Sequence, residues 1–315
     1  MKKSRLIVPI LAALLLLMLV VAVRSRSDLP PAPQRVTVDL TSPSPEFSDD
    51  TPEPSPEPAE KSEEPEILPT TISGGLIVKN NTSYEIEPSE ILSSGCPVKL
   101  KADKPQVLII HTHSSEAYSP AGLDRYVDSG ASRTQDNNYN VIRVGNELEK
   151  VLTQCGINVI HDCGVYDYPS YAGSYSRSEE ATIKQLKENP SISVVIDLHR
   201  DAIGTDDVIY KTVAAEDGVC ASQLMILVGS DEYGLEHPNW MSNLSLAVYL
   251  QNAVVNKYPS LMRPIILVPY RYNQHLTGGS FILEVGSNGN TLQEALAAVR
   301  LFGKAIGPAL VDLVE

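Results

Sequence analysis

Hydrophobic residues beyond position 70 form short runs that predict the strands of a β-sheet. These runs are rich in β-branched residues and lie at 106–110, 157–160, 193–197, 223–228, 265–270 and 280–285. Several are continuous rather than alternating, which is typical of strands that are buried on both faces. The pattern therefore predicts a sheet that is covered on both sides.

Helical patterns lie between these runs. Residues 140–156 place apolar side chains on one helical face and end at Gly156, a common helix terminator. Further helices are predicted over 178–190, 243–258 and 292–313, and a capping box of Thr291 and Glu294 opens the last of them. Strands that alternate with helices predict an α/β fold, with a single, mostly parallel, twisted sheet and helices on both of its faces.

The N-terminal segment, residues 1–26, has the pattern of a membrane anchor. Residues 6–23 carry no charge and are long enough to form a transmembrane helix. Basic residues precede this run, so the positive-inside rule places the N-terminus in the cytoplasm and the remainder outside. Arg24 and Arg26 follow the run directly, which favours an uncleaved anchor over a signal peptide.

Charge and proline content separate a linker from the remaining domain. Residues 27–70 contain 11 of the 23 prolines and a net charge of −9, so we expect a disordered acidic linker. Residues 71–315 are predicted to form one extracytoplasmic domain. The chain has a net charge of −14 and no basic stripe, which argues against nucleic-acid binding. The disulfide status of the four cysteines stays open: Cys96, Cys155, Cys163 and Cys220.

Three of the predicted strands end in chemically active side chains. The first continues as IIHTHSSE (109–116), the third as VIDLHRDA (195–202), and the last as FILEVGSNGN (281–290). The carboxyl ends of parallel strands meet at one edge of a sheet, where ligands usually bind. We therefore expect these side chains to lie in one cleft.

The residue types at this edge predict a catalytic zinc site. His113, Glu116 and His199 are the expected ligands, and a set of two imidazoles and one carboxylate leaves a position open for water. Glu284 is the expected catalytic residue, a carboxylate that moves protons without binding metal. The choice between His111 and His113 as ligand stays open. The His-x-x-Glu spacing favours His113, and His111 would otherwise be hydrogen-bonded behind the ligands.

Weaker candidates surround this set. Arg200 and Asn288 could donate to an oxyanion, although a structural role is favoured for Arg200, and His275 could equally contact substrate or have a structural role. Asp197 or Asp201 could orient the ring of His199. The chain lacks the GxSxG, Walker and HExxH motifs, which removes the corresponding enzyme classes.

Several of these motifs together resemble the stage II sporulation protein P family. The resemblance covers about residues 90–310 and rests on HTHSSEAY (111–118), VVIDLHRDAIG (194–204) and FILEVGSNGNTLQEA (281–295). It implies an amidase-like fold and a zinc-dependent N-acetylmuramoyl-L-alanine amidase that degrades peptidoglycan during engulfment of the forespore. It also implies two partners, sporulation protein D, a glycan-cleaving hydrolase, and sporulation protein M, a membrane protein. The expected location is the cell membrane, with the domain between mother cell and forespore.

One departure from the amidase pattern affects the ligands. In the broader amidases a glutamate ligand opens the first long helix, where this chain has Asn137, so Glu116 is expected to supply the carboxylate. Other readings stay open. A peptidoglycan endopeptidase or carboxypeptidase would use the same zinc site, and a wall-binding module or a membrane-anchored scaffold would need no catalysis.

Overall fold

The computed structural model describes residues 71–73, 76–119, 132–204 and 209–315. The predicted anchor, residues 1–26, and the predicted linker, residues 27–70, lie outside the described residues. None of the described helices is long and apolar enough to cross a membrane. The expectations for the anchor and the linker therefore stay predictions.

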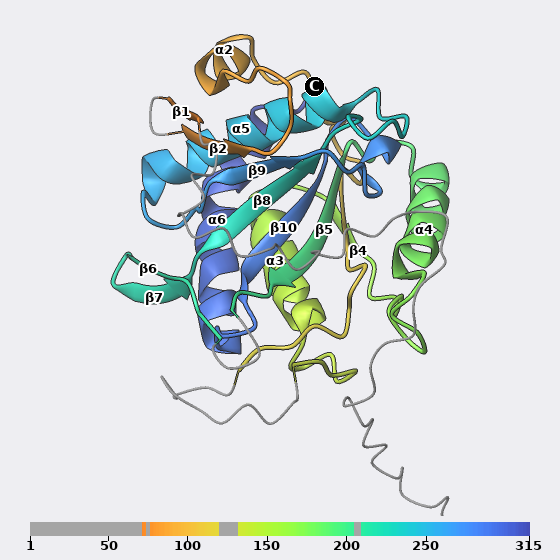
Figure 1. The fold of residues 1–315 in the computed structure, drawn as a ribbon, viewed down its shortest axis with the longest axis vertical. Helices are drawn as coiled ribbons and strands as arrows, with labels where there is room; N and C mark the ends of the chain where they lie inside the picture. The colour runs from red at the N-terminus through yellow and green to blue at the C-terminus, as the bar shows by residue number, and fades with distance from the viewer. Residues whose placement is uncertain (1–70, 74–75, 120–131, 205–208) are drawn as a thin grey trace, which may run out of the picture. The chain divides into compact units, whose positions relative to one another are not determined.

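The described chain forms a mixed eight-stranded sheet, a separate hairpin and five α-helices (Figure 1). The sheet order is β1-β2-β9-β8-β10-β5-β3-β4, and β6 pairs with β7. The strands are β1 Thr71–Ser73, β2 Leu76–Asn80, β3 Val107–Ile110, β4 Val159–His161, β5 Val194–Asp201, β6 Val213–Glu216, β7 Val219–Ser222, β8 Leu224–Gly229, β9 Ile265–Val268 and β10 Ser280–Ser287. The helices are α2 Pro88–Ser93, α3 Val141–Gln154, α4 Ser174–Glu188, α5 Trp240–Lys257 and α6 Leu292–Val311, with a 3₁₀ turn, η1, at Gln274–Leu276.

The predicted α/β fold is confirmed, and the sheet is parallel at all but two of its strand pairs. Strands β4, β3, β5 and β10 run parallel to one another, and β2, β9 and β8 form a second parallel group. The two groups meet in antiparallel pairing between β8 and β10, and β1 pairs antiparallel with β2. The three strands with polar ends, β3, β5 and β10, belong to one parallel group, so their carboxyl ends do share an edge.

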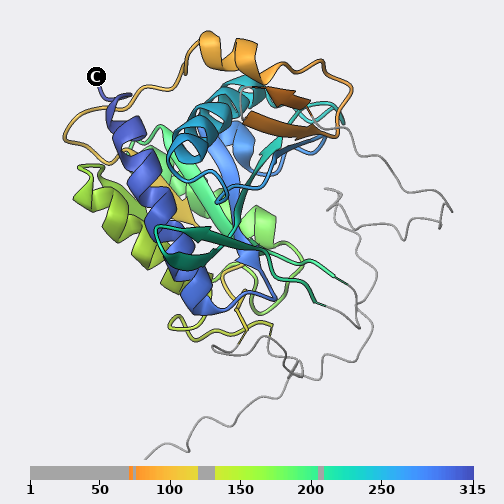
Figure 2. The same cartoon turned by 90° about the vertical axis from the view of Figure 1, so that its left-hand side faces the viewer.

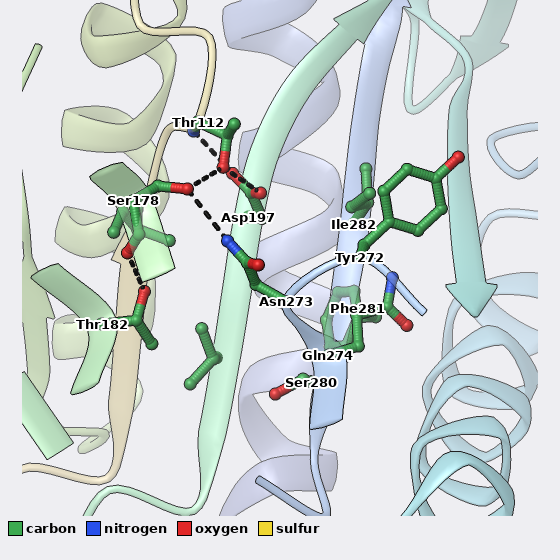
Figure 3. Close-up of a pocket in the computed structure, with 12 residues that line it drawn as sticks. Thr112, Ser178, Thr182, Asp197, Tyr272, Asn273, Gln274, Ser280, Phe281 and Ile282 are labelled. Atoms are coloured by element: carbon green, nitrogen blue, oxygen red, sulfur yellow. Dashed lines mark hydrogen bonds between the residues drawn. The ribbon is translucent and has the colours of Figure 1, made fainter. Parts of the chain in front are cut away.

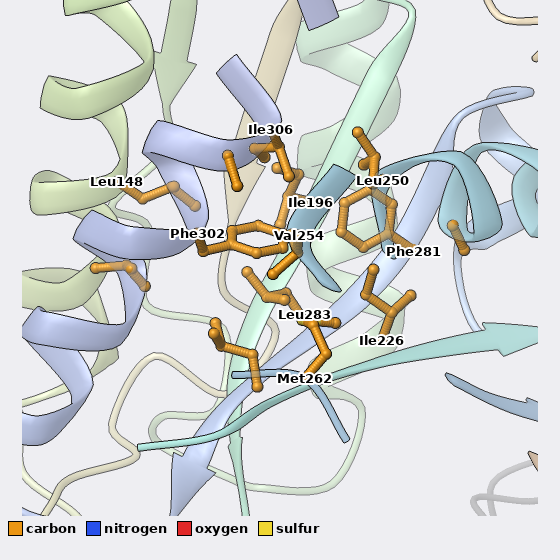
Figure 4. Close-up of a cluster of buried hydrophobic side chains, with 14 of the residues drawn as sticks. Leu148, Ile196, Ile226, Leu250, Val254, Met262, Phe281, Leu283, Phe302 and Ile306 are labelled. Carbon is orange, nitrogen blue, oxygen red and sulfur yellow. The ribbon is translucent and has the colours of Figure 1, made fainter. Parts of the chain in front are cut away.

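Helices cover the two faces of the sheet unequally. The main core packs α3, α5 and α6 against one face, and its largest fully buried side chains include Phe281 of β10 and Phe302 of α6 (Figure 4). Figure 2 shows α6, in dark blue, beside α3 on this side of the sheet. Burial of each such side chain contributes about 1.5–3 kcal/mol.

The other face carries a smaller core beneath α4. Leu108 and Ile110 of β3 and Val195 of β5 pack there against Ala181 and other side chains of α4. Alternate residues of β3 thus enter different cores, since Val107 and Ile109 belong to the main one. Burial on both faces explains why the run at 106–110 is continuously apolar.

The start of α3 fixes the chain that follows β3. Asn140 caps the helix by accepting a hydrogen bond from the backbone N–H of Ile142, and Gly156 follows its end at a φ of 91°. The β-bridge between Ala117 and Asn140 brings the turn after β3 against this helix start. The turn that carries His113 and Glu116 is therefore held at both ends.

Candidate active site

Unequal strand lengths create the site. Strand β3 stops at Ile110, which pairs with Asp197, whereas β5 continues to Asp201. Glu284 of β10 pairs directly with His199 of β5, so both side chains lie on the same face of the sheet. Their neighbours Leu198 and Leu283 enter the main core on the opposite face. His199 and Glu284 therefore lie on the α4 side of the sheet, within their strands rather than after them.

His199 lies between two carboxylates. Its Nδ1 is 3.6 Å from Oε2 of Glu116, and its Nε2 is 2.8 Å from Oδ1 of Asp197. The latter approach lacks hydrogen-bond geometry, which leaves the Nε2 buried without a hydrogen-bond partner. Burial lowers the pKa of His199, but Asp197 and Glu116 outweigh it and raise that pKa well above its usual value. The Nδ1 side of the His199 ring therefore faces Glu116.

The ring of His113 lies beside that of His199, and one of its nitrogens has no hydrogen-bond partner. Its Nε2 is 3.0 Å from the hydroxyl of Tyr171, while its Nδ1 is buried and has no hydrogen-bond partner. The His113 and His199 rings are 5.3 Å apart between centroids, edge to face. Burial lowers the pKa of His113 to about 4, so the ring is neutral at neutral pH, the form that binds metal.

Glu116 is a buried carboxylate with defined donors. Its Oε2 accepts a hydrogen bond of 3.0 Å from the backbone N–H of Arg200, and its Oε1 is 3.6 Å from the guanidinium of Arg133. Burial raises the pKa of Glu116, but the hydrogen bond and charge of His199 outweigh it and hold that pKa well below its usual range. Glu116 is therefore ionised, as a metal ligand must be.

Glu284 has the opposite electrostatic environment. Its Oε2 is buried and has no hydrogen-bond partner. Burial raises the pKa of Glu284 to about 8, with Glu116 and Asp201 adding to the rise and His199 opposing it. Two carboxylates on one face with pKa values moved in opposite directions are typical of a site in which one binds and the other transfers protons.

The donor set fits zinc in its chemistry. His113 offers an unpartnered buried Nδ1, Glu116 an ionised oxygen, and His199 an imidazole that would release a proton on binding a metal. Two nitrogens and one carboxylate oxygen are the ligands of catalytic zinc sites. In the part of the chain that the structure describes, no group of three or more His, Cys, Asp or Glu side chains is drawn together closely enough to be recognised as a metal site. Zinc binding therefore stays a prediction.

Asp197 connects His199 to a hydrogen-bonded chain behind the site. Asp197 accepts hydrogen bonds from the backbone N–H and the hydroxyl of Thr112, at 2.8 and 2.7 Å. The Thr112 hydroxyl also contacts Ser178 of α4, which accepts a hydrogen bond from Asn273 (Figure 3). These side chains line a small pocket between α4, the sheet and the segment before η1. This series of hydrogen bonds fixes Asp197, and Asp197 in turn fixes the ring of His199.

His111 has no nitrogen left for a metal. Its Nδ1 is 2.8 Å from the carbonyl oxygen of Leu198, and its Nε2 is 2.7 Å from the Nε2 of His161. It is completely buried, and burial lowers its pKa to about 3. This geometry favours the structural alternative for His111, and His113 stays the predicted ligand.

Two of the weaker candidates, Arg200 and Asn288, have structural contacts. The guanidinium of Arg200 donates to the carbonyl oxygens of Ala117 and Ser132, at 2.5 and 2.6 Å. Asn288 accepts a hydrogen bond from the backbone of Ile203. These contacts hold the loops that border the site, so we do not assign Arg200 or Asn288 to an oxyanion.

His275 lies in η1, before the start of β10. Its Nε2 is 3.3 Å from Glu179 of α4, and its ring faces His237 at 6.5 Å between centroids. Glu284 lies in the second half of β10, so His275 is brought to the opposite end of that strand. The contacts give His275 no place beside His113 and His199.

Two residues beside the site were not predicted from the sequence. Asp167 accepts hydrogen bonds from Ser114 and from the backbone N–H of Ser115, both at 3.1 Å, and Arg133 bridges Asp167 and Glu116. Neither residue follows a predicted strand, so the strand-end pattern could not select them.

Comparison with known sequences identifies the family. The sequence model described as stage II sporulation protein P matches residues 34–307. The chain belongs to the stage II sporulation protein P family. A curated member from Bacillus subtilis (strain 168) is 28% identical over 225 residues, which cover 67% of this chain and 53% of that protein. The chain thus spans about half the length of the curated relative it matches.

Solved structures of N-acetylmuramoyl-L-alanine amidases show a remote similarity. AmiC2 of Nostoc punctiforme is 14% identical, with a TM-score of 0.38 over 67% of this chain and 97% of that one. The catalytic domain of CwlV from Bacillus (Paenibacillus) polymyxa is 13% identical, with a TM-score of 0.39 over 66% and 97%. Ami1 from Mycobacterium smegmatis is 12% identical, with a TM-score of 0.39 over 68% and 98%.

Proposed function

We propose that this member of the family is a sporulation cell-wall hydrolase, an N-acetylmuramoyl-L-alanine amidase that releases stem peptides from the glycan during engulfment. The observation that carries the proposal is the meeting of His113, Glu116, His199 and Glu284 on one face of the sheet, with the His113 Nδ1 and Glu284 Oε2 buried and unpartnered. Family membership supports the sporulation role.

His113, Glu116 and His199 would hold zinc, and Glu284 would move the proton. Bound zinc supplies a Lewis acid, which polarises the scissile carbonyl and lowers the pKa of water. In its ionised form Glu284 accepts a proton from the attacking water and delivers it to the departing alanine nitrogen. Asp197 keeps the ring of His199 oriented during this transfer, as a carboxylate beside a ligating histidine does.

The proposed location is the cell membrane. Residues 6–23 would anchor the chain and the acidic segment 27–70 would extend the domain away from the bilayer toward peptidoglycan. The family resemblance supports sporulation protein D and sporulation protein M as partners. Both the anchor and the partners belong to the proposal.

Digestion of purified sacculi tests the reaction. The full chain is incubated with sacculi, with zinc or with a chelator, and the fragments are identified by mass spectrometry. Free stem peptides with intact glycan are the expected products, and the chelator should abolish them. Severed cross-links alone would instead show an endopeptidase. Release of terminal residues alone would show a carboxypeptidase. If no products form even with zinc, the chain would be a binding module.

Replacement of Glu284 tests its role in proton transfer. Glu284→Gln should bind zinc as tightly as the wild type and lose about 10²–10⁴-fold in rate, the usual contribution of general acid–base catalysis. Glu188→Gln, at an exposed position of α4, is the matched control and should keep full activity. An active Glu284→Gln variant would remove Glu284 from the mechanism.

A further inference from the structure

We propose that Tyr171 is a positioning residue that holds His113 in the one tautomer able to bind a metal through Nδ1. The inference rests on the proposed function, because it concerns a ligand of the proposed zinc site. It starts from the two nitrogens of His113, of which Nε2 meets the Tyr171 hydroxyl at 3.0 Å and Nδ1 is buried without a partner.

The tautomer follows from proton counting. A neutral imidazole carries one proton, and the nitrogen that binds a metal must be the one without it. An Nδ1 that is free for zinc therefore requires the proton on Nε2, which then donates to the oxygen of Tyr171. In the opposite arrangement the hydroxyl donates to Nε2, and the proton on Nδ1 blocks the metal.

Tyr171 also fixes the plane of the His113 ring. The two rings stack with centroids 4.4 Å apart and an interplanar angle of 13°. Tyr175 and His199 meet the same imidazole edge to face, at 5.5 and 5.3 Å between centroids. Contacts from three rings leave the His113 ring little freedom to rotate.

Arg133 and Asp167 hold Tyr171 over the His113 ring. The guanidinium of Arg133 lies 4.8 Å from the centre of the Tyr171 ring and 3.1 Å from the carboxylate of Asp167. Asp167 in turn accepts hydrogen bonds from Ser114 and Ser115, which separate His113 from Glu116 in the sequence. The turn that carries the ligands and the segment that carries Tyr171 are thus tied to one carboxylate.

Zinc affinity and the proton position of His113 test the proposal together. The full-length chain is compared with Tyr171→Phe, which keeps the stacked ring and loses the oxygen, and with Tyr171→Ala, which loses both. Tyr168→Phe, 55% exposed in the same segment, is the matched control. Zinc affinity is measured by competition with a chelator, and the proton position from imidazole nitrogen shifts of the metal-free protein, assigned with His113→Gln.

The proposal predicts an Nε2-protonated His113 in the wild type and in Tyr168→Phe. Tyr171→Phe should shift protons toward Nδ1 and weaken zinc binding about 10–100-fold, the usual effect of removing a partner of a ligand, and Tyr171→Ala should weaken it further. An Nδ1-protonated wild type, or an unchanged proton position in Tyr171→Phe, would overturn the proposal. The metal-free measurement decides this even if the wild type hydrolyses no peptidoglycan, an outcome that would defeat only the proposed function.

Discussion

Two histidines one residue apart, His111 and His113, have opposite environments. The protein itself occupies both nitrogens of His111, through the Leu198 carbonyl and His161. In His113 one nitrogen meets Tyr171 and the other is buried without a partner. Buried polar groups are normally hydrogen-bonded, so an exception needs an explanation, and a ligand is one. In this pair, unused bonding capacity rather than residue type separates the predicted ligand from the structural histidine.

Exchange of each histidine for glutamine gives the largest expected contrast. His113→Gln should lose zinc binding and reduce sacculus hydrolysis to the background rate, because a ligand is gone. His111→Gln should keep zinc and activity but lower the free energy of unfolding by about 1–3 kcal/mol, because buried hydrogen-bond partners lose their geometry. Zinc content, product release and urea unfolding of both variants provide the measurements. Loss of zinc only in His111→Gln would reverse the assignment of the ligand.

A methyl group added at Gly145 should break the His111–His161 pair by steric overlap. A Cβ there would lie 2.6 Å from Nε2 of His161 and 2.8 Å from Nε2 of His111. We expect Gly145→Ala to lower the free energy of unfolding by about 1–3 kcal/mol, although alanine favours a helix over glycine by about 1 kcal/mol. Thr153→Ala, exposed on the same helix, is the control in thermal and urea unfolding. A more stable Gly145→Ala variant would show that the pair is not tightly packed.

Acid should destabilise the structural pair gradually. Burial lowers the pKa of His161 to about 4, with Asp162 opposing, from a usual value of 6.5. Above about pH 6.5 both the folded and unfolded chains carry a neutral ring. As the pH falls from 6.5 to about 4, only the unfolded chain takes up the proton, so stability falls by up to about 1.4 kcal/mol per pH unit from this residue.

His161→Gln removes that protonation and should make the dependence less steep, while His111 and His113 continue to contribute to it. The free energy of unfolding in urea, measured at several pH values within this window, provides the comparison with the wild type. Parallel curves for the two proteins would contradict a neutral buried His161.

Local patterns in the sequence predicted much of the fold, and they failed where contacts are long-range. The apolar runs located β3, β5, β8, β9 and β10, and the capping box placed the start of α6. The hairpin β6–β7 and the strands β1 and β2, at one side of the sheet, were missed. The antiparallel direction of β8 against β10 was also missed, since alternation and burial are the same in either direction.

For the site, the sequence by itself determined the residue types and their positions near the ends of the apolar runs. His113, Glu116, His199 and Glu284 could be selected because chemically active side chains interrupt apolar runs, and the order of the strands was not needed for that step. Tertiary structure alone decided that Glu284 pairs with His199, that His111 pairs with His161, and that Tyr171 covers His113. The physical reason is that hydrogen-bond partners and the pKa values they set depend on neighbours 50 or more positions away, such as His161 beside His111, which no local pattern specifies.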